Sequence, residues 1–160
     1  MSVQIVKDYL KQWNKAQDVK EFSVSSATVQ LAAAALGVAP ARIAKSITFK
    51  KEEGCLLVVA AGDARVDNAK FKAQFGVKPR MLTAEEVFAR TGYNVGGVCP
   101  FALPEGVSLF LDVSLKRFIT IFPACGSSNS CIELTCEELE TCCSSLGWVD
   151  VCKNWQESTR

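Results

Sequence analysis

The chain has 160 residues, of which 49% are apolar and 22% are charged, a composition typical of a folded protein of one-domain size. Its 18 Lys and Arg balance 17 Asp and Glu, so the net charge is +1. This balance excludes the strongly basic proteins that hold long nucleic acid, and DNA is not an expected partner. No stretch approaches the roughly 20 apolar residues of a membrane helix, so a membrane is not an expected partner either.

The first elements expected are a helix and an edge strand. Apolar residues recur at helical spacing over residues 3–13, with Ser2 as a cap. This stretch carries lysines and lacks the continuous apolar centre of a secretory signal, so we expect a cytoplasmic protein. Residues 19–24 are rich in strand formers and predict the edge strand.

Capping residues and glycines mark further helices along the chain. Ser25 and Ser26 can cap an alanine-rich segment, and Pro40 suits the first turn of a short helix. Thr83 and Thr135 each precede a glutamate by three residues, which is the capping-box pattern. The helices expected from these signals cover residues 26–37, 40–44, 67–76, 83–92 and 135–147.

Alternating apolar residues between turn signals predict the remaining strands. The strands at 46–51 and 55–61 flank a four-residue loop that ends in Gly54, which predicts a hairpin. The other strands are expected at 107–112, 118–122, 130–134 and 148–151.

Irregularly interleaved helices and strands, with some connections too short for a helical crossover, indicate an α+β fold. We expect a curved, mixed and largely antiparallel sheet, barrel-like in shape and surrounded by helices. There is no internal repeat and no linker, so residues 1–155 are expected to form a single domain, and residues 156–160 a frayed tail.

The chain has eight cysteines and no histidine. No Cys-x-x-Cys pair occurs, so the cysteines are interpreted as small packing residues rather than zinc ligands, although a cysteine-based redox or metal protein stays an alternative. The missing histidine removes the usual Ser-His-Asp and Cys-His machinery. Any hydrolysis must rely on lysine, carboxylates, main-chain N–H groups or the substrate itself, and neither a metal nor another cofactor is expected.

Lys45 is the most unusual position. Alternation places its side chain on the apolar face of the strand with Ile47 and Phe49, where a lysine needs an anionic partner or water. The alternative is a lysine at the corner between helix and strand whose ammonium reaches solvent.

Two loops contain small residues suited to holding a ligand. Residues 95–101 include Gly96 and Gly97, which let a ligand approach main-chain N–H groups, and Pro100, which stiffens the loop. Residues 124–129 present small polar side chains between two strands. A tight turn explains the first loop equally well, and for the second loop hydrogen bonds within its own turn are the default interpretation.

Two charged groups have structural interpretations. Asp63, Arg65 and Asp67 are interpreted as a salt-bridged turn with a helix cap. Asp112 and Arg117 are interpreted as a structural pair across a turn.

Five segments, taken in chain order, resemble one family. It is the YbaK-type family of aminoacyl-tRNA editing proteins, related to the editing insertion of bacterial prolyl-tRNA synthetase, and the resemblance runs from about Ser25 to Val151. The segments that carry it are Ala39–Ile47, Gly62–Lys70, Thr91–Phe101, Leu111–Phe118 and Ala124–Asn129.

The resemblance implies the fold of that editing domain and hydrolysis of the ester that joins a wrong amino acid to the terminal adenosine of tRNA. The family's essential lysine corresponds to Lys45, which is the expected catalytic residue. The residues that correspond to the family's substrate loop and to a second loop near the pocket are Gly96, Gly97, Val98, Pro100, Gly126, Ser127 and Asn129.

The expected substrate is a small amino acid, alanine first and then serine or cysteine, on proline tRNA. The resemblance supplies the tRNA, while the bulky apolar neighbours Val29, Ile43, Ile47 and Phe49 indicate a narrow pocket around Lys45. The expected partners are the acceptor end of aminoacyl-tRNA and prolyl-tRNA synthetase. The alternative is a non-catalytic module of the same fold that binds tRNA ends or a synthetase.

Overall fold

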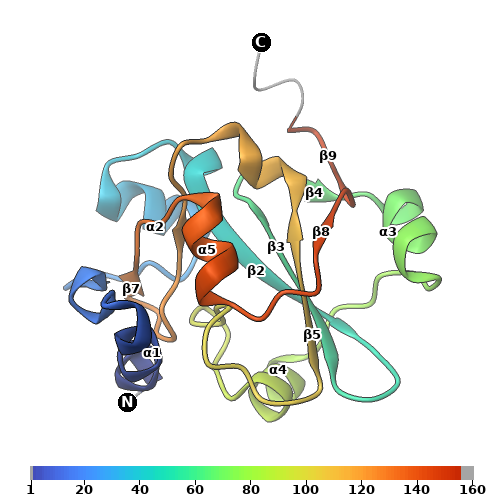
Figure 1. Cartoon of the computed structure of the whole chain (residues 1–160). Coiled ribbons are helices and arrows are strands. Elements are labelled where there is room, and N and C mark those ends of the chain that lie inside the picture. Colours follow the sequence, from blue (N-terminus) through green and yellow to red (C-terminus); the bar gives the residue numbers. More distant parts are fainter. Residues whose placement is uncertain (1, 156–160) are drawn as a thin grey trace.

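The computed structural model describes residues 2–155, so the predicted tail lies outside the described residues (Figure 1). Their α-helices are α1 (Ser2–Leu10), α2 (Val29–Leu36), α3 (Asn68–Phe75), α4 (Ala84–Thr91) and α5 (Cys136–Cys142). Short 3₁₀ helices are η1 (Lys11–Trp13), η2 (Ala16–Asp18), η3 (Pro40–Arg42) and η4 (Val113–Arg117). The strands are β1 (Lys20–Glu21), β2 (Ile43–Lys50), β3 (Cys55–Ala61), β4 (Arg65–Val66), β5 (Val107–Asp112), β6 (Phe122–Pro123), β7 (Ser130–Cys131), β8 (Trp148–Val149) and β9 (Cys152–Lys153).

The central sheet has the strand order β6-β2-β3-β5-β8. The predicted hairpin is confirmed, because β2 and β3 pair antiparallel from Ala44↔Ala61 to Lys50↔Cys55. Strand β5 joins β3 in parallel, and β6 and β8 join β2 and β5 in parallel. Parallel pairing is possible here because residues 62–106 and 113–147, which contain helices, are long enough to cross over between the paired strands.

The expected mixed sheet is thus confirmed, while the barrel shape is not. The outer strands β6 and β8 have two residues each and do not pair with one another, so the sheet is open within residues 2–155. The pairs β1–β7 and β4–β9 form two separate antiparallel sheets of two strands. The antiparallel strand pairs are those of these two small sheets and the long β2–β3 pair of the central sheet.

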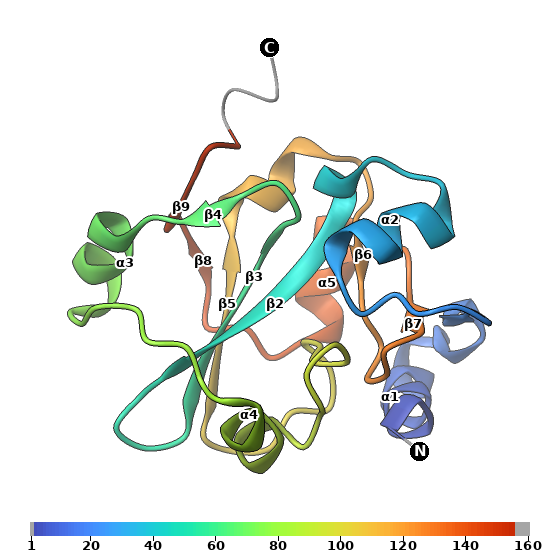
Figure 2. The same ribbon diagram turned by 180° about the vertical axis from the view of Figure 1, so that it is seen from behind.

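Helices lie on both sides of this sheet. Helix α5 lies in front of it in Figure 1, and α2 lies in front of it in the reverse view of Figure 2. The main apolar core includes almost all of β3, which is buried along its whole length, with Leu10, Phe71 and Leu139 from three helices. A smaller core joins Ala32 and Ala33 of α2 to β2, β6 and β7.

Local capping signals predicted several helix ends correctly. Both capping boxes are present, with the Thr83 and Thr135 side chains accepting hydrogen bonds from the backbone N–H groups of Glu86 and Glu138. Asp67 caps α3 as predicted.

Other boundaries differ from the prediction. Thr28 caps α2 instead of the serines before it, and α5 ends at Cys142, well before Gly147. The strand expected at 19–24 is limited to β1, because only Lys20 and Glu21 pair with β7.

Of the strand expected at 118–122, only the end forms, because Ile121 bridges to Leu134 and Phe122 begins β6. Residues 118–120 are in no strand and directly follow η4, which Asp112 caps by accepting a hydrogen bond from Ser114 N–H at 2.9 Å. The predicted pair of Asp112 with Arg117 is wrong: Asp112 also accepts from Val151 N–H, whereas Arg117 pairs with Asp63.

Candidate active site

Strand β2 has an outer edge that is only partly covered. Strand β6 pairs with its first two residues, and Phe49 forms a bridge with Met81. Between them, residues 45–48 have no strand neighbour on that edge within the described part of the chain. Lys50 N–H donates across this edge to Arg80 O at 2.7 Å. Because strand geometry repeats every two residues, the N–H and C=O groups of Ser46 point to the same open edge.

A cavity of about 380 Å³, within the size range of ligand pockets, follows this edge. All six residues Ile43–Thr48 line it. One face of a strand presents only every second side chain, so consecutive residues can line one cavity only at the strand's edge. The opposite walls come from the start of α2, the segment at Met81, the loop at Gly96 and the strands β6 and β7.

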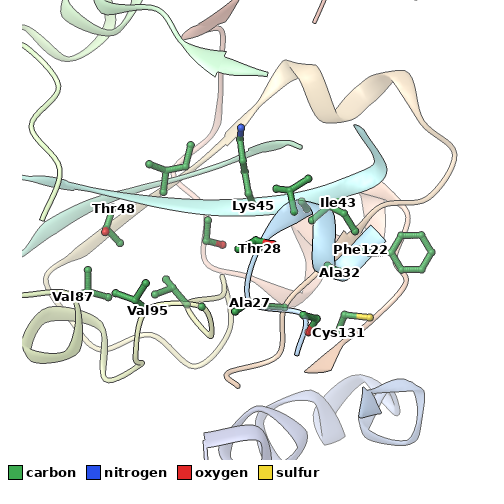
Figure 3. A pocket seen from close by; sticks show the side chains of 18 of the residues that line it. Ala27, Thr28, Ala32, Ile43, Lys45, Thr48, Val87, Val95, Phe122 and Cys131 are labelled. Atoms are coloured by element: carbon green, nitrogen blue, oxygen red, sulfur yellow. The ribbon is translucent and has the colours of Figure 1, made fainter. Parts of the chain in front are cut away.

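Lys45 is the one charged residue among the described residues that line the cavity. Figure 3 shows its side chain leaving β2 on the opposite side from Thr48 and Val95. Its ammonium donates to the carbonyl oxygens of Gly62 and Ala64, at 3.3 and 2.5 Å. Within residues 2–155 no carboxylate forms an ion pair with Lys45. The partners of its ammonium are therefore neutral carbonyl groups, and not the anionic group that the sequence suggested.

Burial lowers the pKa of Lys45 below the ordinary lysine value of 10.5. The negative charge of Asp63 opposes this shift, and the positive charge of Arg65 adds to it. An ammonium that is partly removed from water and has only carbonyl dipoles as partners keeps most of its attraction for an anionic or carbonyl oxygen.

Ser46 carries a second polar group at this edge. Its hydroxyl oxygen is buried without a hydrogen-bond partner among the described residues. Buried polar atoms are nearly always paired, so an unpaired one in a cavity wall indicates a position where a ligand atom can bind. The main-chain groups of Ser46 at the open edge add a donor and an acceptor beside it.

The structure brings six of the eleven predicted site residues together around this cavity, and it places five outside the lining. Those that line it are Lys45, Val29, Ile43, Ile47, Gly96 and Val98. Those outside are Gly97, Pro100, Gly126, Ser127 and Asn129.

Most of the predicted residues outside the lining lie in contacts between neighbouring loops. A side chain on Gly97 would place a Cβ 3.0 Å from main-chain atoms of Gly126 and Ser127, so the glycine permits the two loops to pack together. The Asn129 side-chain amide donates from Nδ2 to Phe22 O at 2.9 Å, and its Oδ1 accepts from the Ser127 hydroxyl. Pro100 lies at another, smaller hollow.

The sequence reasoning missed Ser46, Thr28 and Met81 as cavity residues. Alternation assigned Ser46 to the solvent face, and only the edge position of β2 shows that both faces reach the cavity. Thr28 could have been found from the sequence, because threonine is a common residue at the start of a helix. No sequence pattern indicated Met81.

The eight cysteines are free thiols; seven are buried and Cys136 is half-buried. Burial raises the pKa of the Cys99 thiol to about 12. Within residues 2–155 no cluster of Cys, Asp and Glu could hold a metal ion. None of the described helices is long and apolar enough to cross a membrane.

Comparison with known proteins gives this site a family context. The family model described as "Aminoacyl-tRNA editing domain" matches residues 24–142, which include every lining residue of the cavity. The uncharacterized protein YwhH of Bacillus subtilis (strain 168) is 53% identical over 98% of this chain and all of its own length. Proline–tRNA ligase of Thermotoga sp. (strain RQ2) is 35% identical over 77 residues, 48% of this chain and only 13% of the ligase.

Solved structures agree with this match. A candidate trans-editing enzyme for prolyl tRNA synthetase superposes with a TM-score of 0.84 at 28% identity, covering 96% of this chain and 98% of its own. Hypothetical protein APE2540 superposes with a TM-score of 0.78 at 31% identity, covering 91% and 99%. Both the sequence match and the structural likeness extend over nearly all of the fold. The chain belongs to the aminoacyl-tRNA editing domain family.

Proposed function

We propose that this protein is a trans-editing hydrolase that removes a wrongly attached amino acid from tRNA. The observation that supports it best is the cavity at the open edge of β2, where, among the described residues, Lys45 is the single charged lining residue and no carboxylate forms an ion pair with it. Such a cavity suits an ester whose carbonyl oxygen becomes negative during hydrolysis.

The reaction adds a water oxygen to the ester carbonyl carbon and breaks the bond between that carbon and the ribose oxygen. The ribose oxygen takes up a proton, and the products are the free amino acid and uncharged tRNA. The Lys45 ammonium would attract the carbonyl oxygen as negative charge develops there. Ser46, with an unpaired hydroxyl and outward main-chain groups, would fix the acyl group by hydrogen bonds.

The cavity walls favour a small side chain. Val29, Ile43 and Ile47 all line the cavity, and no lining residue offers an acidic or basic partner besides Lys45. We propose alanine, with serine and cysteine as further substrates, because an apolar pocket separates side chains that differ by one methylene by only about 1–3 kcal/mol. The match to proline–tRNA ligase supports proline tRNA as the carrier.

A second groove supports a proposal for where the tRNA binds. It has a volume of about 780 Å³ and apolar walls that include Phe75 and Phe110. Its basic residues are Lys50, Lys51, Lys78 and Arg80. Strand β2 connects the two sites: Lys45 and Lys50 are five residues apart, about 17 Å along an extended strand. We propose that phosphates near the acceptor end lie here, with prolyl-tRNA synthetase as a further partner and the cytoplasm as the location.

The test is a deacylation panel on one proline tRNA charged with alanine, serine, cysteine or proline. We expect hydrolysis of the alanine ester and little hydrolysis of the correct proline ester. Lys45→Ala should remove turnover while leaving the thermal unfolding midpoint near that of the parent. Turnover of correctly charged tRNA at the rate of the alanine form would contradict editing, and tight binding with no turnover on any ester would indicate a non-catalytic module.

A further inference from the structure

Lys45 is held by a turn that carries a charged residue of opposite sign. We propose that the Asp63–Arg117 ion pair positions Lys45: it fixes the two carbonyls that bind the ammonium, and it keeps the Asp63 carboxylate from pairing with that ammonium. Arg117 and Asp63 are positioning residues in this proposal, since they act through Lys45. The inference rests on the proposed function, because Lys45 is the residue proposed to contact the substrate.

The acceptors of Lys45 belong to one tight turn between β3 and β4. Ala64 N–H donates to Ala61 O at 3.0 Å and closes the turn, and the Lys45 ammonium contacts the carbonyls of Gly62 and Ala64. These two residues flank Asp63 directly. A Cβ on Gly62 would lie 2.1 Å from Pro40 O, so glycine is needed where η3 packs on the turn.

Arg117 holds the carboxylate of this turn with both of its terminal nitrogens. Its Nη1 lies 3.0 Å from Asp63 Oδ2, and its Nη2 lies 2.5 Å from Asp63 Oδ1. The side chains are only 10% and 22% exposed, so this two-point pair is shielded from water and salt. The guanidinium also lies over the rings of Phe118 and Trp155, which limits its movement.

A buried hydrogen-bond network connects the Asp63–Arg117 ion pair to the sheet. Arg117 Nε donates to Ser114 O at 3.0 Å, and the Ser114 hydroxyl accepts from Ala61 N–H at 3.1 Å, at the start of the same turn. Ser114 N–H donates in turn to Asp112, which is fully buried. The turn, η4 and the end of β5 therefore form one connected unit, and such satisfied networks specify a single geometry.

Without this arrangement, Asp63 would compete with the substrate. It lies one residue from each carbonyl that Lys45 contacts, and an ion pair with a carboxylate would neutralise the ammonium and raise the Lys45 pKa. Arg117 occupies both carboxylate oxygens, so Lys45 meets carbonyl dipoles instead. The other titratable or charged groups that act on Lys45 are Cys152 of β9 and Arg65 of β4.

A double-mutant cycle separates this role from plain structural support. In Arg117→Gln, Asp63 loses the guanidinium and should pair with the Lys45 ammonium, so kcat on the alanine ester should fall by about tenfold or more, while KM changes little. Removing the competing charge as well, in Asp63→Asn/Arg117→Gln, should restore kcat to within about threefold of Asp63→Asn alone. If the double variant is as slow as Arg117→Gln or slower, the pair serves structure only and the proposal is overturned.

A second readout does not depend on activity. The pH dependence of Lys45 acylation by acetic anhydride, followed by peptide mass spectrometry, reports its pKa, with the exposed Lys11 as internal reference. We expect the Lys45 midpoint to rise by about one pH unit in Arg117→Gln and to return in the double variant. Arg117→Lys, which keeps one charge near Asp63, replaces Arg117→Gln if that variant unfolds, and should show a smaller rise.

The two readouts distinguish the proposals. Unchanged Lys45 titration in every variant would overturn the positioning role and leave the proposed hydrolysis standing. The predicted titration shifts, combined with no hydrolysis of any ester by the parent protein, would refute the proposed function and retain the positioning of Lys45.

Discussion

At the scale of single residues, Lys45 owes its properties to where its strand lies. It follows the two residues of β2 that pair with β6, so it stands where the outer edge opens. Its partly buried ammonium reaches two carbonyls of a neighbouring turn and no carboxylate of the described residues. This combination leaves a positive charge without a carboxylate partner beside a mostly apolar cavity.

The direction of the pH dependence tests how Lys45 acts. Burial lowers its pKa, so the ammonium is lost as pH rises through a value below that of an ordinary lysine. If the ammonium is the active form, the rate ratio of the parent to Lys45→Ala should fall with rising pH. Dividing by the variant removes the ester's own sensitivity to hydroxide. A ratio that rises with pH would instead mean that the neutral amine acts as a general base.

The candidate site could be predicted in part at this scale. The five segments that resemble the editing family, taken in chain order, were enough to locate three residues that line the cavity: Lys45, Gly96 and Val98. Gly97 was assigned to substrate approach, but its missing side chain serves the contact between two loops. A sequence shows that a position needs glycine and does not show which neighbour approaches it.

At the scale of elements, capping explains which helices the sequence could locate. The box at α5 joins Thr135 and Glu138, and Glu138 also pairs with Lys15 at 2.6 Å. Such signals depend on residues three apart, so they can be read directly. The segment 118–122 could not be read in this way, because it follows η4, and the residues at the two ends of η4, Asp112 and Arg117, also bind the distant Val151 and Asp63.

Removing the α5 cap should measurably destabilise the protein. Thr135→Ala loses the bond to Glu138 N–H and should lower the free energy of unfolding by about 1 kcal/mol. Thr141→Ala is the matched control, since its hydroxyl is exposed and only donates to Glu137 O within the helix. Denaturant unfolding of both variants checks this. Equal stability of the two variants would show that the box contributes nothing measurable.

At the scale of the whole molecule, the near-zero net charge hides a local concentration of positive charge. Four basic residues line one groove, where Glu52 is the one acidic lining residue among the residues described and Glu86 Oε1 lies 3.9 Å from Lys50 Nζ. The topology at this scale was the hardest to predict. The short loop between β2 and β3 correctly predicted that these strands pair antiparallel. Strands β3 and β5 pair in parallel but are separated by residues 62–106, so no local sequence pattern indicates their pairing.

The basic groove predicts a modest salt dependence of tRNA binding. Lys78→Ala should weaken binding and reduce the slope of log affinity against log salt by about 1, the value for one lost phosphate contact. Lys11→Ala, which removes an exposed lysine paired with Asp8, is the matched control and should leave the slope unchanged. Fluorescence anisotropy with labelled tRNA at several salt concentrations measures both. An unchanged slope in Lys78→Ala would place the tRNA on another surface.

The open edge of β2 also has a consequence for self-association. An unpaired strand edge is a template on which a second chain can add a strand and begin an aggregate. Here β6 and the bridge at Met81 confine the exposure to residues 45–48. Aggregating segments are typically about 5–7 residues long and low in charge, whereas this one has four residues and includes Lys45. The same short interval that admits a ligand is therefore too short, and too charged, to recruit another copy of the chain.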